Sequence, residues 1–430
     1  MPRCLLVNPV VNHNILANFL LRRGVECFAF IDMEKVGKLS TDMKNRERDF
    51  DRSLYTEIYL SLDELPDPAS QPFDAVMAGG EIGVEEADQI CAGYQLPGND
   101  PETTRFRRNK EAMQKQLSAA GLPHIKTIGI SKGDDLRSIV ERIPEGPYIL
   151  KPVDAAGGEG LRFCRNFEEL ENAIQLVDWG AFNCTWRHNE RFLVQEYISG
   201  TEYVVDLVAR NGELVVSAIS RYVRLCDMGY WSAPNVKRFL ILENPSHPKF
   251  IHLIELAKQC CKALGIRQGA AHMEFLDGPK GLRMVEVGAR LHGSLVPSLY
   301  SECYENDLLS SLYVAYFDKT APLLEGNLKK YGLRSFVVAN ESGTLTALDP
   351  IENAWLQQCG SLFETSTSCL AGEDYPRTSD EVNTPASGFL VNDNFDQLLS
   401  DTCIHDQIWG KHFNSIPYEK ADLARWLVPR

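Results

Sequence analysis

The segment of residues 270–293, AAHMEFLDGPKGLRMVEVGARLHG, restricts the possible folds more than any other part of the chain. Two short apolar runs flank the turn sequence DGPKG at residues 277–281, and this pattern predicts a β-hairpin. The first strand carries Glu274, the second carries Glu286, and Arg290 follows four residues later. Carboxylates are costly to bury among apolar side chains unless they are paired or bind something. The hairpin is therefore both a core element and a candidate site.

The register of this hairpin decides which side chains meet. We expect Leu276 to pair with Leu282 across the turn, and side chains alternate between the two faces of each strand. One face then carries His272, Glu274, Met284 and Glu286. The other face carries Met273, Phe275, Val285 and Val287. Diagonal neighbours on one face lie roughly 7–8 Å apart, so the two carboxylates are close enough to share a metal ion.

Composition narrows the class of protein. A chain of 430 residues exceeds what one core usually supports, so we expect two or three domains. A net charge of -15 without a basic patch argues against nucleic acid as a partner. The first apolar run, residues 5–11, is too short for a membrane span or a signal peptide. Twelve cysteines without a Cys-x-x-Cys pair indicate reduced thiols in a cytoplasmic protein.

The N-terminal region has the alternation of an open α/β domain. Strands are predicted at residues 4–7, 26–31 and 73–78, with a helix over 12–23 and another through residue 92. No Gly-x-Gly-x-x-Gly follows the first strand, so the dinucleotide-binding loop is missing. The layout is Rossmann-like without a cofactor loop.

The middle of the chain mixes helices and hairpins. A helix is predicted over residues 109–120 with Asn109 as its cap, and Asn166 caps another in which Glu169 completes a capping box. Further helices are predicted over 134–142 and 250–264. Strands are predicted at residues 125–130, 148–151, 161–164, 192–198, 203–210 and 213–223, the last two joined by Asn211-Gly212. Beyond residue 310 the pattern is less legible, with a short strand at 333–338.

A lysine and a glycine-rich loop follow the strand at residues 148–151. Lys151 ends the strand, and the sequence AAGGEG occupies residues 155–160. Small residues between two strands let the backbone bend over a phosphate chain and present its N–H groups, with Lys151 adding positive charge. The loop is not a Walker A motif, which needs Gly-Lys-Ser/Thr leading into a helix. Taken alone, a flexible turn and a surface lysine are the simpler interpretation.

A third element is the segment QEYISGTE at residues 195–202. A strand that leaves the core and turns at Gly200 can hold an adenine edge with main-chain groups, while Glu202 accepts ribose hydroxyls. Taken alone, Glu196 and Glu202 are more simply read as solvated acids.

Arranged in series, these elements resemble the ATP-grasp superfamily. The resemblance covers roughly residues 70–295, and the sequence AGGE at 78–81 is similar to the end of the family's preceding domain. It implies an α/β and α+β ATP-grasp fold. The expected domains are a Rossmann-like α/β domain over 1–105, an ATP-grasp domain over 106–310 and a C-terminal domain over 311–430. Within the second, a lid subdomain of about 122–198 and a metal-binding subdomain of about 199–310 would clasp ATP.

The resemblance also implies roles for particular residues. Lys110 and Lys151 would contact ATP, and Gly157, Gly158 and Gly160 would form a mobile lid loop. Gln195, Glu196, Tyr197 and Ile198 would hold adenine, and Glu202 the ribose. Glu274 and Glu286 would hold Mg²⁺, with Mn²⁺ as the alternative ion, because such cations prefer oxygen ligands. Catalytic roles fall to Arg290, Lys151 and His272.

Two of these residues have competing interpretations. His272 would hold a substrate carboxylate or orient Glu274, or else be a core histidine bonded to a neighbour. Arg290 would stabilise charge on the phosphoryl group, or else form a structural pair with a nearby acid. Gly288 stands where many ATP-grasp enzymes have an asparagine ligand, which leaves one or two metal ions as alternatives.

Within the superfamily, the motifs around Glu274 and Arg290 look most like L-amino acid ligases and dapdiamide-synthetase-type ligases. The implied function is an ADP-forming ligase that joins an amino acid to an amino acid or small carboxylic acid through an acyl phosphate. A biotin-carboxylase-like or purine-pathway enzyme and a non-catalytic nucleotide-binding regulator are the alternatives. We expect small-molecule substrates, a cytoplasmic location and neither nucleic acid nor membrane as a partner, with a homodimer left open.

Overall fold

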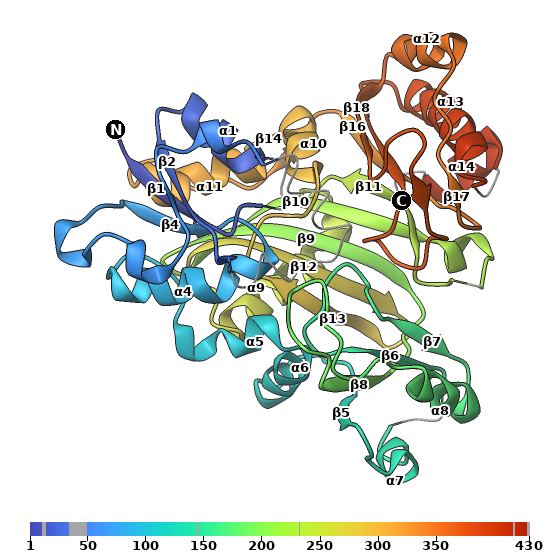
Figure 1. Cartoon of the computed structure of the whole chain (residues 1–430), viewed down its shortest axis with the longest axis horizontal. Coiled ribbons are helices and arrows are strands. Elements are labelled where there is room, and N and C mark those ends of the chain that lie inside the picture. The colour runs from blue at the N-terminus through green and yellow to red at the C-terminus, as the bar shows by residue number, and fades with distance from the viewer. Residues whose placement is uncertain (11–13, 34–49, 144–145, 232, 416–417, 428–430) are drawn as a thin grey trace.

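The computed structural model describes residues 1–10, 14–33, 50–143, 146–231, 233–415 and 418–427. A long antiparallel sheet crosses the middle of the molecule (Figure 1), with N-terminal elements at one end and C-terminal helices at the other. A smaller sheet with its own helices lies along one side of the long sheet. No helix in these ranges is long and apolar enough to cross a membrane.

The N-terminal region is a parallel sheet with the strand order β3-β2-β1-β4. Its elements are β1 (Arg3–Val7), α1 (Ile15–Arg22), β2 (Glu26–Phe30), β3 (Ile58–Tyr59), β4 (Ala75–Ala78) and α4 (Val84–Gly93). The strands are buried apolar runs, as expected when helices cover both faces of a parallel sheet. The strand predictions here are confirmed, while residue 12, where the first helix was predicted to begin, lies outside the described ranges.

A helical linker leads into the smaller sheet. It contains α5 (Arg105–Arg108) and α6 (Lys110–Ala119), and the Asn109 side chain caps α6 by accepting from the Ala112 N–H. The sheet has the order β5-β8-β6-β7 and is antiparallel. Its elements are β5 (Thr127–Ser131), α7 (Leu136–Val140), β6 (Tyr148–Pro152), β7 (Arg162–Cys164), α8 (Phe167–Gln175) and β8 (Arg191–Glu196).

The capping box predicted at α8 forms only in part. The Asn166 side chain accepts from the Glu169 N–H as predicted. The Glu169 carboxylate, however, accepts from the N–H of Arg165 at 2.8 Å. The reciprocal bond therefore lies one residue upstream of the cap residue.

The long sheet has the order β13-β12-β9-β10-β11-β16-β20-β18. Its strands are β9 (Thr201–Arg210), β10 (Glu213–Arg224), β11 (Lys237–Glu243), β12 (Gly269–Gly278), β13 (Gly281–Gly288), β16 (Tyr331–Val337), β18 (Leu362–Thr367) and β20 (Ala386–Asn392). Helices around it are α9 (Ile251–Ala263), α10 (Val296–Cys303), α11 (Leu308–Phe317), α12 (Pro350–Gln358), α13 (Phe395–His412) and α14 (Lys420–Leu427). Short pairs join β14 (Tyr304–Glu305) to β15 (Asn327–Leu328) and β17 (Gly343–Thr344) to β19 (Asp374–Tyr375).

The two faces of β9 and β12 have different environments. On one face, Met273 and Phe275 pack with Val205 and Leu207 against α9, and all four are fully buried. Burying a Met or Phe side chain contributes roughly 1.5–3 kcal/mol each, so this face anchors the hairpin. The opposite face carries Asp206 and the acids of the candidate site.

The predicted hairpin register is wrong. Leu282 pairs with Asp277 rather than with Leu276, so the register at the turn already differs by one residue from the prediction. Phe275 then pairs with Met284, and a bulge at Val285 makes Glu274 pair with Glu286. Met284 is consequently buried with the apolar core rather than lying beside the acids. The bulge shifts the pairing by one residue and brings Glu274 and Glu286 directly opposite each other.

Candidate active site

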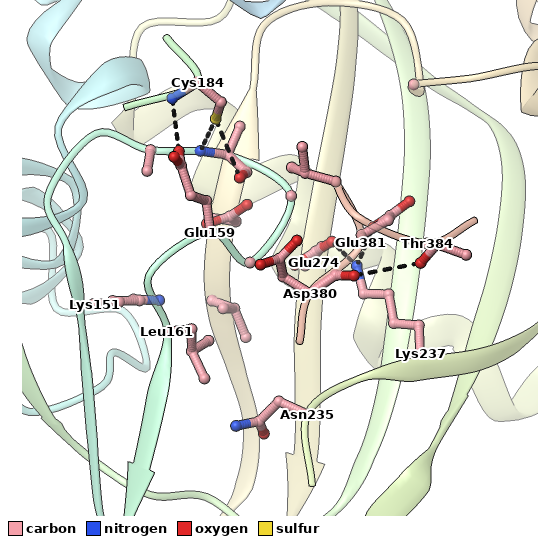
Figure 2. Close-up of a pocket in the computed structure, with 18 of the residues that line it drawn as sticks. Lys151, Glu159, Leu161, Cys184, Asn235, Lys237, Glu274, Asp380, Glu381 and Thr384 are labelled. Atoms are coloured by element: carbon pink, nitrogen blue, oxygen red, sulfur yellow. Dashed lines mark hydrogen bonds and ion pairs between the residues drawn. The ribbon is translucent and has the colours of Figure 1, made fainter. Parts of the chain in front are cut away.

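A cavity of about 360 Å³ lies between the smaller sheet, the long sheet and the segment of residues 376–387. Figure 2 shows Lys151, Glu159 and Leu161 on one side of it and Lys237, Asp380 and Glu381 on the other. Nearly all residues singled out from the sequence line it: Lys110, Lys151, Gly157, Gly158, Gln195, Glu196, Tyr197, Ile198, Glu202, His272, Glu274, Glu286 and Arg290. Gly160, with a φ of 69°, is not among the residues that line the cavity.

Strand alternation explains why these polar groups converge. On β9, Glu202 and Asp206 point to the cavity face, and on β12 His272 and Glu274 do the same. His272 pairs with Asp206 across the two strands. The intervening residues of both strands enter the apolar core on the other face. One face of the sheet thus carries the titratable groups, while apolar packing on the other face fixes the strands that position them.

Each acid of the hairpin lies against a lysine. Lys110 Nζ is 3.2 Å from Glu286, and Lys237 Nζ is 2.8 Å from Glu274. Lys237 also lies 3.4 Å from Glu381 and rests 3.7 Å above the Tyr222 ring centroid. Burial alone would raise the pKa of Glu274, but the charge of Lys237 outweighs it, so the pKa is lowered. The Glu274 carboxylate is thereby kept ionised for oxygen coordination of a cation.

Lys151 and the glycine-rich loop form the wall opposite the acids. Burial lowers the pKa of Lys151 to about 8, with Lys110 acting in the same direction and Glu286 opposing it. Gly157 and Gly158 have φ values of 64° and 75°, a region that favours glycine. The Gly157 carbonyl accepts the Glu381 N–H at 3.0 Å, which joins the loop to the C-terminal region.

Arg290 is held by an acid from the N-terminal sheet region. Its Nε lies 2.7 Å from Glu81, whose other oxygen contacts Arg108. Burial alone would raise the pKa of Glu81, but Arg108 and Arg290 outweigh it and lower it to about 2. Arg290 therefore has the structural partner that sequence reasoning offered as one interpretation, and it also faces the cavity.

The predicted adenine and ribose contacts lie at the other end of the cavity. The Gln195 amide donates to Thr127 at 2.6 Å, which fixes the end of β8. Glu202 is 3.4 Å from Arg224, which also lines the cavity. Arg221 lies on the same strand but is not among the residues that line the cavity. Its Nε lies 3.0 Å from the Glu243 carboxylate.

Comparisons with known proteins agree with this geometry. Residues 145–298 match the model of the ATP-grasp domain. The chain carries an ATP-grasp domain. The matched residues include Lys151 of β6, the glycine-rich loop, both hairpin acids and Arg290. The superfamily predicted from the sequence is confirmed.

The chain is also similar to curated proteins named as a synthase and an amino acid ligase. The chain is 28% identical to dapdiamide A synthase of Enterobacter agglomerans over 56% of its own length and 57% of that protein. It is 23% identical to an L-arginine-specific L-amino acid ligase of Bacillus subtilis, over 68% of both chains. It thus spans little more than half the length of some curated relatives that it matches. An L-amino acid ligase structure from Bacillus licheniformis superposes with a TM-score of 0.71, covering 94% of this chain and 97% of that one at 15% identity, which confirms the predicted fold.

The ATP-grasp domain departs from the common pattern at Gly288, and the structure gives a physical reason. A Cβ atom at this position would lie 2.7 Å from Glu81 Oε2 and 3.2 Å from the Arg290 guanidinium. The pair between Glu81 and Arg290 therefore occupies the space that a side chain would need. On the hairpin itself, the candidate oxygen ligands for a cation are the carboxylates of Glu274 and Glu286.

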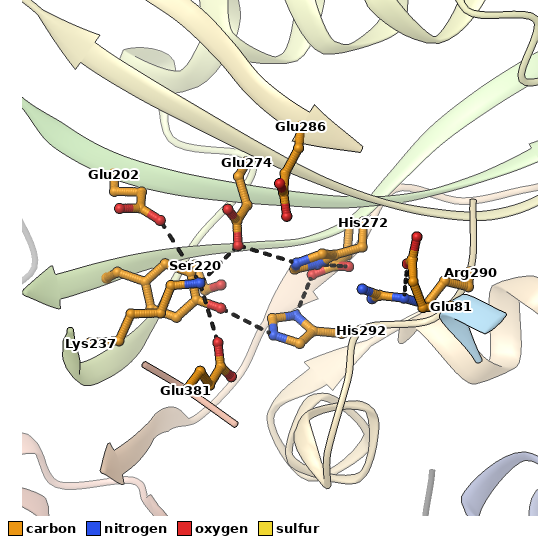
Figure 3. Close-up of polar contacts among 12 residues, drawn as sticks. Glu81, Glu202, Ser220, Lys237, His272, Glu274, Glu286, Arg290, His292 and Glu381 are labelled. Carbon is orange, nitrogen blue, oxygen red and sulfur yellow. Dashed lines mark hydrogen bonds and ion pairs between the residues drawn. The ribbon is translucent and has the colours of Figure 1, made fainter. Parts of the chain in front are cut away.

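Several residues that line the cavity were not singled out from the sequence. They are Glu81, Lys237, His292, Arg334 and Glu381. Figure 3 shows Lys237 directed at Glu202, Glu274 and Glu381, and Arg290 beside Glu81. Buried acids predict that some cation lies beside them. No sequence spacing, however, identifies Lys237 as that cation. His272, by contrast, was predicted and bonds to Asp206 at 3.0 Å.

Proposed function

We propose that the protein is an ATP-dependent carboxylate–amine ligase. It would form an amide or peptide bond through an acyl phosphate and release ADP and phosphate. The observation that carries the proposal is the pairing of Glu274 with Glu286 in a cavity that also holds Lys110, Lys151 and Arg290. Acids beside a cluster of cations fit a magnesium nucleotide and a phosphoryl group in transfer.

The residues present fit Mg²⁺ in chemistry, since two carboxylates face one cavity and Mg²⁺ shares substrate phosphates with such ligands. When bound there, the ion would neutralise charge on the phosphates of ATP. Lys110 and Lys151 would position those phosphates, and Glu202 would contact the ribose. The number of ions stays a prediction of one or two.

The remaining residues provide for the acyl phosphate. A carboxylate has a poor leaving group, so phosphorylation precedes attack by an amine. Arg290 would stabilise the negative charge that develops on the phosphoryl and acyl oxygens, because fixed cations act strongly in a water-poor site. The loop with Gly157 and Gly158 would close over the intermediate, since water would otherwise hydrolyse it.

The similarity to dapdiamide A synthase and an L-amino acid ligase supports amino acids as substrates. The test is ADP release with Mg²⁺, ATP and pairs of standard L-amino acids or small dicarboxylates, with the product identified by mass. Amide product that depends on both partners supports the proposal. Bicarbonate-dependent ADP release without amide would favour a carboxylating enzyme, and tight ATP binding without turnover would favour a regulator.

A further inference from the structure

His292 lines the cavity, and the His272 ring lies between it and Glu274. The resemblance to ATP-grasp enzymes assigned no role to His292. Its ring centroid is 4.1 Å from that of His272, and the side chain is 3% exposed. It lies in the stretch after β13, four residues before α10. Figure 3 shows the two rings side by side, between Glu274 and the loop that follows Arg290.

Asp206 fixes the orientation of both imidazoles. Its Oδ1 lies 3.0 Å from His272 Nδ1, and its Oδ2 lies 2.9 Å from His292 Nδ1. The Tyr300 hydroxyl donates to the same Oδ2 at 2.7 Å. A buried carboxylate with an acid-shifted pKa only accepts, so both Nδ1 atoms carry protons. The Nε2 atoms are then the variable positions.

The two Nε2 atoms differ in their surroundings. His272 Nε2 lies 3.7 Å from the Glu274 carboxylate, so an acid already occupies the space beside this nitrogen. Burial and the charge of His272 lower the pKa of His292 to about 4. His292 is therefore neutral, and the lone pair on its Nε2 faces the Tyr222 hydroxyl at 3.5 Å, the outer limit of a hydrogen bond.

We propose that His292 accepts the proton that the attacking amine loses as the amide bond forms, an inference that rests on the proposed ligase function. The amine nitrogen bonds to the acyl carbon, its surplus proton moves to Nε2, and the C–O bond to the phosphoryl group breaks. Phosphate leaves with the electron pair, and the imidazolium then returns its proton to phosphate or water.

The surrounding charges suit this transfer. A nitrogen that has just bonded to the acyl carbon carries a positive charge and is far more acidic than the free ammonium, so a weak base accepts its proton. The new imidazolium would lie against the Asp206 carboxylate and within the field of Glu381, both of which favour it, while His272 opposes it. Tyr222 and Tyr300 complete the contacts of the ring. The substrate class that follows is an amine that carries at least one N–H.

The test separates acyl phosphate formation from amide formation. Hydroxylamine captures acyl phosphates without a catalyst, so hydroxamate reports the first step, and mass-detected amide reports both. Standard L-amino acids serve as the carboxylate and amine panel with ATP and Mg²⁺. In His292→Gln we expect amide formation to fall by about 100-fold or more while hydroxamate formation stays within about threefold of wild type. His252→Gln, on the exposed surface of α9, is the matched control and retains both.

A second variant keeps the test decisive. In His292→Gly, added imidazole should restore amide formation, which a purely structural role would not allow. Equal loss of hydroxamate and amide in His292→Gln, or full amide formation in that variant, would overturn the role of His292. Either result would leave the ligase proposal standing. Zinc retained by wild type through dialysis and lost from His292→Gln would assign the ring to a metal site instead. Wild type that yields no hydroxamate with any carboxylate would overturn the ligase proposal and this role together.

Discussion

Glu81 couples the N-terminal region to the ATP-grasp domain, and its neutralisation tests how the site is held. One oxygen lies 2.7 Å from Arg290 Nε and the other contacts Arg108. The three side chains are 17%, 15% and 8% exposed, so water replaces these contacts poorly. In Glu81→Gln, two guanidinium groups lose their shared anion without a change in side-chain size. We expect a less stable protein with a misplaced Arg290.

The magnitude follows from the pKa of Glu81. Its depression from 4.5 to about 2 corresponds to about 3 kcal/mol of unfolding free energy at neutral pH. Removing one partner of a buried pair costs about 3–5 kcal/mol, which agrees. Because the folded pKa is the lower one, this stability is complete above pH 4.5 and is lost as the pH falls toward 2. The deficit of the variant should shrink to roughly half at pH 3.

The assay is urea unfolding of wild type and Glu81→Gln at pH 7 and pH 3, followed by tryptophan fluorescence. Glu85→Gln is the matched control, since Glu85 pairs with Arg187 at the surface, where the side chains are 39% and 43% exposed. Exposed pairs contribute about 0–1 kcal/mol. A deficit in Glu81→Gln no larger than in the control, or one that does not shrink at pH 3, would refute the reasoning.

Three further substitutions address the metal ligands, the lid and the C-terminal region. Glu286→Gln should lower Mg²⁺-dependent ADP release by about 100-fold with little change in Tm, because a ligand charge is lost. Gly157→Ala should raise the KM for ATP and the ATP hydrolysis without amide product, because the residue has a φ of 64° and its Cβ would lie 2.9 Å from Val382 Cγ2. Asp406→Asn should cost about 2–4 kcal/mol in urea unfolding with the KM for ATP unchanged, because it weakens the 2.7 Å pair with buried Arg238.

Each of these has a contrary outcome. Undiminished ADP release by Glu286→Gln would remove that residue from the metal ligands. Wild-type coupling of ATP use to amide in Gly157→Ala would show that the loop tolerates both the strain and the contact. A changed KM for ATP in Asp406→Asn would show that the pair between Asp406 and Arg238 affects the nucleotide site.

Local patterns explain why much of the fold was predictable. Asn109 caps α6 and the Asn211-Gly212 turn joins β9 to β10, because both signals act within a few residues. The predicted hairpin register failed at two points: the turn pairs Leu282 with Asp277 rather than with Leu276, and a bulge at Val285 then inserts one more residue, which period-two alternation cannot show. The bulge separates Met284 from the acids and aligns Glu286 with Glu274. Both acids therefore line the cavity, while their pairing differs from the prediction.

The site residues that were missed share a physical cause, since long-range packing brings them together. The ammonium of Lys237 meets Glu202 from β9, Glu274 from β12 and Glu381 from the segment before β20. β11 and β12 are separated in the sheet by β9 and β10, so only a long side chain crosses to the acids. Without an anion on each side, a buried ammonium would lose its charge. Lys237 thus depends on groups spread over nearly half the chain, and no local motif could have assigned it.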